Sequence, residues 1–344
     1  MFKKLGKSTL SLLNQPSILS GAAVVGKTEG EGPLQNEFDC IYKDDTLGED
    51  SFEKAESHLQ QEAIRIALEK AKKEPTEIDY ILGGDLLNQC TASAFALRDF
   101  PVAFLGLYGA CSTMALSLGL AGVLTNAKAA QLVLAETSSH FCSAERQFRL
   151  PLEYGGQRTP TAQRTATAAG ATLVTAKHLP DFPYLSAVTF GQIVDLDIHD
   201  SNNMGAAMAP AAANTIAKFL NDTHTTPFDY DVIFTGDLGT VGSTLLKELL
   251  KKDYDISIGD KQKDCGLLLF DCEKQDVHAG GSGCGCAASV LNSYILHRLF
   301  DGTFRKVLLV ATGALLSPTT SMQGESIPGI AHAVCLEMPE RTKL

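Results

Sequence analysis

The sequence lacks several features that define particular classes of protein. No window approaches the roughly 20 uninterrupted apolar residues that a membrane-spanning helix requires. Residues 1–13 include three lysines but neither an apolar core of useful length nor a small-residue cleavage site, so we expect no signal peptide. Lysine and arginine do not cluster as phosphate-backbone binding requires, and the formal net charge is −11. The composition therefore argues against a nucleic-acid partner.

The cysteines also lack the spacing of a disulfide or zinc protein. There are nine of them, an odd number, scattered through apolar and glycine-rich stretches. Cys284-Gly285-Cys286 has neither Cys-x-x-Cys spacing nor a second pair at a suitable distance. We therefore expect free thiols in a reducing, cytoplasmic compartment and no metal site.

The chain repeats itself, which constrains its fold more than local propensity does. Two apolar strands end in Gly-Asp-Leu, and two later strands share one offset that also places Cys111 opposite Cys286. The paired segments are 81–86 with 233–238, and 134–138 with 309–313. Each half is predicted to run strand, long helix, strand, small-residue helix and buried strand, an alternation typical of parallel sheets.

These patterns predict an α/β protein of two similar halves, residues 1–179 and 184–344, separated at Pro180 and Pro183. In the first half, an apolar stripe predicts the long helix over 51–73. In the second half, its counterpart is predicted to begin near Ala211, because the preceding Pro210 suits a first helical turn.

The turn formed by residues 109–113 is the most informative motif. It follows the apolar run 102–108 and opens a small-residue helix over 114–124, so Cys111 is predicted to lie at a helix N-terminus. Such a position favours a thiolate and also favours a bound anion. Three interpretations of Cys111 stay open: a residue of a ligand pocket, a buried core cysteine, and a nucleophile.

Eight stretches, in this order, resemble the thiolase-fold superfamily of thiolases and ketoacyl synthases and, within it, the stage V sporulation protein AD family over nearly the full length. They are 84–89, 109–113, 137–140, 144–149, 153–157, 207–213, 280–284 and 311–318. The resemblance implies layers in the order α-β-α-β-α and a homodimer formed through the first half. It also implies binding of pyridine-2,6-dicarboxylate (dipicolinic acid), as the free acid or as its calcium chelate, and help in its delivery into the developing spore.

The same resemblance implies a location and partners. We expect the protein to be cytoplasmic in the forespore and peripherally associated with the spore inner membrane. The other stage V sporulation A membrane proteins are its expected partners, and no cofactor is expected.

The catalytic partners of a superfamily cysteine are missing from the sequence. In the superfamily, a histidine in a His-Gln-Ala-Asn or similar loop and an asparagine or second histidine in a glycine-rich turn serve the cysteine. Here the corresponding loops, 235–239 and 280–286, contain neither residue type. Asp237 is an anion that would raise the pKa of a neighbouring thiol and so oppose its activation. We therefore predict a protein that binds its ligand without catalysis.

The remaining candidate ligand-binding residues lie at strand ends and in one arginine-rich stretch. Ser138, Ser139 and His140 follow a buried strand at the edge where open α/β sheets bind ligands, although turn chemistry and a structural histidine would explain them equally well. Ser282 lies in the glycine-rich turn, and Asp237 and Asn88 follow the two Gly-Asp-Leu strands; a helix N-cap or a turn is the alternative role of Asp237, and the superfamily implies a dimer contact or pocket wall at Asn88.

Arg146 begins the only arginine-dense stretch, which also includes Arg149, Arg158 and Arg164 beside Phe148 and Tyr154. Guanidinium groups pair with carboxylates and aromatic rings stack on a pyridine, so this stretch suits a flat dianion. A solvated loop or a subunit contact explains the same residues.

Two other functions stay open. An acyl transferase or condensing enzyme would be acylated at Cys111, with His140 in place of the lost base. An assembly scaffold for membrane channel subunits would keep the fold but not need the pocket.

Overall fold

The computed structural model describes residues 2–148 and 158–340. The helices are α1 (Lys27–Gly30), α2 (Phe52–Ala71), α3 (Thr91–Leu97), α4 (Thr113–Asn126), α5 (Phe141–Phe148), α6 (Met204–Thr223), α7 (Gly239–Tyr254), α8 (Cys265–Leu269), α9 (Cys284–Val290), α10 (Leu296–Phe300) and α11 (Pro318–Met322). The strands are β1 (Phe2–Leu5), β2 (Thr9–Leu12), β3 (Ser17–Val25), β4 (Cys40–Ile41), β5 (Tyr80–Gly84), β6 (Ala103–Gly106), β7 (Leu132–Ser139), β8 (Arg164–Thr165), β9 (Ala168–Thr175), β10 (Tyr184–Thr189), β11 (Val232–Thr235), β12 (Gln262–Asp264), β13 (Gly281–Ser282), β14 (Lys306–Ala314) and β15 (Gly329–Glu337).

The two halves share one order of strands. The first half runs β6-β5-β7-β9-β3 and the second runs β12-β11-β14-β15-β10. In each half the first three strands are parallel, whereas the last two are antiparallel to their neighbours. A single residue pair, Tyr184 with Ser17, joins β10 to β3. The repeat seen in the sequence is therefore a repeat of topology, whereas the division at 179 and 184 stays a prediction.

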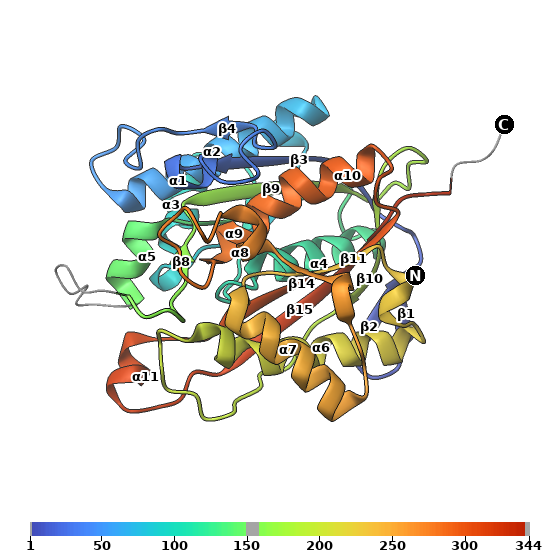
Figure 1. Ribbon diagram of the computed structural model, residues 1–344. Coiled ribbons are helices and arrows are strands. Elements are labelled where there is room, and N and C mark those ends of the chain that lie inside the picture. The colour runs from blue at the N-terminus through green and yellow to red at the C-terminus, as the bar shows by residue number, and fades with distance from the viewer. Residues whose placement is uncertain (1, 149–157, 341–344) are drawn as a thin grey trace.

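The elements stack in five layers, as Figure 1 shows. Helix α2 covers β3 and β9 of the first half, and α6 covers β14 and β15 of the second. Helices α4 and α9 lie between the two sets of strands: α4 packs on β7 and β15, whereas α9 packs on β9 and contacts the second half where the Cys286 thiol meets the carbonyl of Gly236. The predicted α/β class and the α-β-α-β-α order are confirmed.

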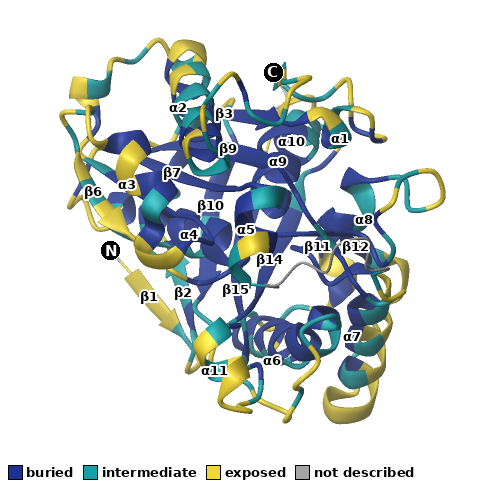
Figure 2. Ribbon diagram, turned by 90° about the vertical axis from the view of Figure 1, so that its left-hand side faces the viewer, coloured by how far each residue is buried: buried dark blue, intermediate teal, exposed yellow. Residues whose placement is uncertain are grey.

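Most of the central layer is buried, including every residue of α9 (Figure 2). Met114, Leu118 and Ala121 of α4 are fully buried, and small residues let the neighbouring elements approach closely. At Gly122, for example, a Cβ atom would press on Leu185 and Leu12. A polar group at the start of a central helix is consequently held in a dry, well-packed environment.

The long helices show where local signals succeeded and where one failed. Helix α2 begins after Ser51, whose hydroxyl accepts the N–H of Lys54 at 3.3 Å, and ends at Lys72, close to the predicted bounds. The prediction that its counterpart starts near Ala211 was wrong. Helix α6 begins at Met204, capped by Asn203, and Pro210 lies inside it. Packing of its alanine-rich face on β15 outweighs the one hydrogen bond that the proline removes.

Candidate functional site

Cys111 lies in a tight turn at the start of the central helix α4. Ala110 has a left-handed backbone with φ of 49°, and Ser112 donates its N–H to the carbonyl of Gly109 at 3.1 Å. The turn packs against β14 at Gly313, where any side chain would collide with the carbonyl of Gly109. Residues far apart in sequence therefore fix the position of the thiol.

Ser282 is the structural counterpart of Cys111. Each directly precedes an N-cap residue, Ser112 for α4 and Gly283 for α9. The two side chains meet, with Sγ and Oγ 4.0 Å apart. The predicted correspondence with Cys286 is thus displaced, because α9 begins at Cys284 and Cys286 lies within the helix. The starts of the helices, rather than a constant sequence offset, decide which residues face each other.

Asp237 is the polar centre of this group and is fully buried. One carboxylate oxygen accepts the Ser282 hydroxyl at 3.2 Å and the Gly283 N–H at 3.0 Å. The other oxygen accepts the hydroxyl of Thr312 at 2.8 Å. Burial raises the pKa of Asp237 to about 7. The carboxylate thus joins loops from the second half beneath Cys111.

The surroundings of Cys111 hold its thiol in the protonated form. Burial raises the pKa of the Cys111 thiol well above its ordinary value, and the adjacent carboxylate of Asp237 raises it further. The N–H of Gly283 acts in the opposite direction but is outweighed. A thiolate is the reactive form of cysteine, so this site disfavours nucleophilic attack.

A small cavity opens on Cys111. Its volume of about 30 Å³ accommodates one water molecule. Among the described residues, the lining consists of Leu86, Cys111, Ala144, Glu145, Phe148, Thr165, Met204, Ser282 and Leu316. A neighbouring pocket of about 270 Å³ is lined by Asn88, Gln89, Tyr108, Phe148, Leu315, Leu316, Ser317 and Pro318. The two share Phe148 and Leu316, which therefore stand between the thiol and the wider pocket.

His140 is not among the described residues lining either cavity. Its Nε2 lies 2.7 Å from the carbonyl of Asp45, and its Nδ1 accepts the N–H of Cys142 at 3.2 Å. Burial lowers the pKa of His140, so the ring is neutral with both nitrogens occupied. This arrangement describes a structural histidine better than a base for Cys111.

The serines before His140 also face the interior. Ser138 donates to the carboxylate of Glu56 at 2.9 Å and accepts from Gln60 at 2.6 Å. Ser139 donates to the carbonyl of Ala166 at 2.7 Å. Both hydroxyls therefore bind the elements behind the site, and neither residue is part of the described lining of the two cavities.

The described arginines of the arginine-rich stretch each contact a different residue. Arg146 forms an ion pair with Glu53 of α2 and is half exposed. Arg158 pairs with Asp276 at 2.9 Å, and Arg164 stacks on the ring of Phe141. Arg149 and Tyr154 lie outside the described residues. The described arginines do not line the cavities beside Cys111.

Asn88 does contribute to the wider pocket, as the resemblance implied for a pocket wall. Its side-chain oxygen accepts a hydrogen bond from Gln147 at 2.8 Å, which ties the loop after β5 to α5. Its own N–H also points at the Gln147 oxygen, at 3.3 Å. One amide pair thus sets the width of the pocket.

Local sequence patterns did not predict a role for the acidic residues Glu145, Glu56 and Glu136. Glu145, buried beside Arg146, lines the cavity of Cys111, and its carboxylate accepts the Thr165 hydroxyl at 3.3 Å. Glu56, Asp85 and Glu136 form a buried cluster behind Ser138, and burial raises the pKa of all three. The apolar neighbours of Glu145 on one helical face could have indicated that this residue is buried. No local sequence pattern indicates that Glu56, Asp85 and Glu136 lie together.

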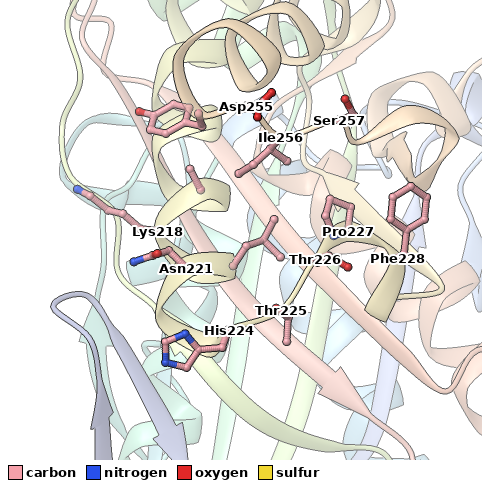
Figure 3. Close-up of a pocket in the computed structure, with 13 residues that line it drawn as sticks. Lys218, Asn221, His224, Thr225, Thr226, Pro227, Phe228, Asp255, Ile256 and Ser257 are labelled. Carbon is pink, nitrogen blue, oxygen red and sulfur yellow. The ribbon is translucent and has the colours of Figure 1, made fainter.

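A larger cavity lies elsewhere. It measures about 740 Å³ and is formed by the C-terminal ends of α6 and α7 and the segment that follows α6 (Figure 3). Lys218 and His224 line it together with Asp255, so its charge is mixed. It shares no lining residue with the cavities beside Cys111.

Two kinds of feature are absent from the described residues, namely a cluster of metal ligands and a membrane-spanning helix. Within 2–148 and 158–340, no three histidine, cysteine or acidic side chains are grouped so that they would hold a metal ion. No helix in that part of the chain is long and apolar enough to cross a bilayer.

Comparisons with known folds agree with the layered architecture. A condensing enzyme of tetronic acid, AbyA1, is 16% identical and matches with a TM-score of 0.60 over 93% of this chain and 99% of its own. Human mitochondrial 3-ketoacyl-CoA thiolase in complex with CoA is 13% identical, with a TM-score of 0.58 over 95% and 99%. The 3-oxoacyl-[acyl-carrier-protein] synthase III of Aquifex aeolicus VF5 is 13% identical, with a TM-score of 0.56 over 94% and 99%. These similarities establish the thiolase-like fold.

Sequence comparison is more specific than fold comparison. The family model described as stage V sporulation protein AD (SpoVAD) matches residues 6–337. Stage V sporulation protein AD of Bacillus subtilis (strain 168) is 43% identical over 335 residues, which cover 97% of this chain and 98% of the relative. The chain therefore belongs to the stage V sporulation protein AD family.

Proposed function

We propose that this protein binds pyridine-2,6-dicarboxylate without catalysis and aids its uptake into the developing spore. The main support is the environment of Cys111, where the adjacent group is the buried carboxylate of Asp237, which opposes ionisation of the thiol. A condensing cysteine needs a proton acceptor and donors for an oxyanion, and the described lining of its cavity includes no imidazole. A site that keeps its cysteine protonated is suited to binding rather than to acyl transfer.

The wider pocket supplies the space and the ring contacts. Together the two cavities reach about 300 Å³, the lower end of the range for small-molecule sites. Tyr108 and Phe148 offer aromatic faces to a pyridine ring. The side-chain amide of Asn88 offers N–H groups to its carboxylates, whereas the hydroxyls of Thr165 and Ser282 donate to Glu145 and Asp237. We propose that the ligand enters beside Asn88 and reaches toward Cys111 when Phe148 and Leu316 move apart.

The charge of the lining favours the calcium chelate over the free dianion. Neither described lining includes lysine or arginine, whereas Glu145 and the nearby Asp237 are acidic. A bare dianion would be repelled, but its one-to-one calcium chelate is neutral. Calcium takes six to eight oxygen ligands, and the Glu145 carboxylate would supply one of them in exchange for a present partner such as the Thr165 hydroxyl. Calcium is then cargo that arrives with the ligand.

Calorimetric titration tests both parts of this proposal. We expect pyridine-2,6-dicarboxylate with calcium to bind at least about tenfold more tightly than the same ligand in a chelator, because the repulsion is removed. Glu145→Gln is expected to weaken binding of the chelate by about tenfold and to leave binding of the free acid unchanged or tighter. Glu325→Gln, at an exposed site beyond α11, is the matched control and should change neither.

Pyridine-2-carboxylate is the ligand control. Equal weak heats from the monocarboxylate and the dicarboxylate would end the binding proposal. The alternative enzyme makes a different prediction, since Cys111 would gain the mass of an acyl group when the protein meets acyl-coenzyme A. An adduct present in the wild type and absent from Cys111→Ser would replace ligand binding with acyl transfer.

The exposed surface of the first half supports a homodimer, which we propose forms along β6. This strand ends the path of the sheet and pairs only with β5 among the described strands. Leu105, Phe95 and Tyr108 are exposed by 42%, 56% and 46%, respectively. An unpaired edge beside exposed apolar side chains is typical of an interface. Tyr108 would link that interface to the ligand pocket.

Leu105→Arg is expected to convert a dimer into a monomer. Two-fold symmetry would bury the new charge twice. We therefore expect the dissociation constant of the dimer to rise by at least about 100-fold. Analytical ultracentrifugation over a concentration series measures this shift. Ile193→Arg, at a residue 61% exposed in the second half, is the control and should remain dimeric. A wild-type protein that is monomeric at all concentrations would contradict the proposed interface.

A further inference from the structure

The first strand of the N-terminal hairpin, β1, covers little of the molecule. Strand β1 pairs with β2 alone, so its other backbone edge has no partner among the described strands. Phe2, Lys3 and Lys4 are exposed, and Figure 2 shows β1 as an exposed strand at the margin of the molecule. The hairpin does not belong to either cavity beside Cys111.

Buried contacts anchor the turn of this hairpin. The carboxylate of Asp222, on α6, accepts the N–H groups of Lys7, Ser8 and Thr9 at 3.4, 3.0 and 3.0 Å. Gly6 has a φ of 53°, and any side chain there would collide with the same carboxylate. Strand β2 in turn pairs with β10. The direction in which β1 projects is therefore fixed by the body of the protein.

An ordered strand that buries so little requires a physical explanation. Fixing each residue costs roughly 1–2 kcal/mol of conformational entropy, and β1 recovers little of that by burial of its own side chains. An open strand edge is a template for pairing with another chain. A partner strand would satisfy the free backbone groups and cover Phe2.

Charge identifies the kind of partner. Lys3, Lys4 and Lys7 are exposed, and no described carboxylate lies within 4 Å of their ammonium groups, although the chain as a whole has a net charge of −11. A second copy of β1 would place lysine against lysine, which is destabilising across strands. We propose that β1 binds an acidic, extended segment of a partner protein, which adds to its open edge as a further strand.

A synthetic peptide tests this mode of binding on the full chain. The probe is a labelled eight-residue peptide of alternating threonine and glutamate, followed by fluorescence anisotropy at low ionic strength. We expect it to bind, and we expect amide hydrogen exchange to slow across residues 2–5. Lys3→Glu combined with Lys4→Glu should weaken binding by about tenfold, because whichever lysine shares a face with the glutamates of the peptide becomes a repulsive cross-strand partner.

Three controls separate strand addition from simple charge attraction. Lys247→Glu with Lys252→Glu, on the exposed face of α7, makes the same change in net charge and should leave binding intact. The same peptide with alternate backbone nitrogens methylated should not bind, because it cannot pair with the strand edge. A peptide of threonine and lysine should not bind either.

Several results would overturn the proposal. Equal affinity for the methylated peptide would show charge attraction without strand pairing, and equal losses in the two double variants would show no role for the hairpin. Failure of the acidic peptide to bind would contradict it directly. Uptake by phosphatidylglycerol vesicles that depends on Lys3 and Lys4, without peptide binding, would assign the surface to a membrane instead.

Discussion

Asp237→Ala is expected to lower the free energy of unfolding by about 3 kcal/mol. The substitution leaves three donors without their acceptor in a dry site, namely the hydroxyls of Ser282 and Thr312 and the N–H of Gly283. Each buried donor left unsatisfied costs about 1–3 kcal/mol, and rotation of the two hydroxyls offsets part of the sum. Urea denaturation at pH 6 measures this loss. Asp237 is mostly protonated there, because its pKa is about 7, so the cost of burying its charge does not enter the comparison.

The matched control for this variant is Asp229→Ala. Asp229 also accepts two hydrogen bonds, from the N–H and hydroxyl of Thr226, but at an exposed turn where water replaces it. Its removal should cost at most about 1 kcal/mol. Equal stabilities of Asp237→Ala and the wild type would show that the carboxylate does not hold the start of α9 and strand β14 together.

The protein is expected to lose stability as the pH rises from about 5 to about 8. Burial raises the pKa of Glu29 and of Asp237 to about 7, and it also raises the pKa of Glu56. In the unfolded chain these carboxyls titrate near pH 4, so between pH 4 and 7 the folded state binds more protons than the unfolded state. The free energy of unfolding therefore falls with pH in this window, by up to about 3 kcal/mol for each group, and levels off above the folded pKa.

Carboxylates whose pKa is lowered in the folded state affect stability in a more acidic pH range. The ion pair with Arg65 holds the pKa of Glu62 below its usual value, so its contribution is present at neutral pH and is lost only in acid. We expect maximal stability near pH 5, measured by urea denaturation at unit pH steps. Glu29→Gln should flatten the decline, since its second oxygen lacks a hydrogen-bond partner in the described structure. A stability that increases from pH 5 to 8 would contradict the protonated state of the buried acids.

The chemistry at Cys111 could be read from sequence only in part. The turn 109–113 placed the cysteine at the start of α4 because small residues and the preceding apolar run are local signals. The loss of histidine and asparagine from 235–239 and 280–286 was equally visible. The direction of the effect of Asp237 on the thiol pKa agrees with simple electrostatics, since an adjacent anion opposes ionisation.

The site could not be completed from the same signals. Ser138 and Ser139 are the last residues of β7 and only His140 follows the strand, and their side chains bond to Glu56, Ala166 and Asp45 rather than facing the cavity of Cys111. A strand alternates its faces, and the end of β7 is covered on both sides by other elements. Which face meets the ligand depends on those neighbours, and they come from distant parts of the chain.

The sequence by itself determined the alternation of strands and helices, the internal repeat and the absence of histidine and asparagine from 235–239 and 280–286. Those features follow from apolar periodicity and residue type, which are properties of a few neighbouring positions. Only the tertiary structure decided that Ser282 faces Cys111, that Glu145 lines the cavity and that β1 projects with an open edge. Each of these depends on contacts between residues more than 100 positions apart or on the absence of a neighbouring strand, and neither is encoded in a local pattern.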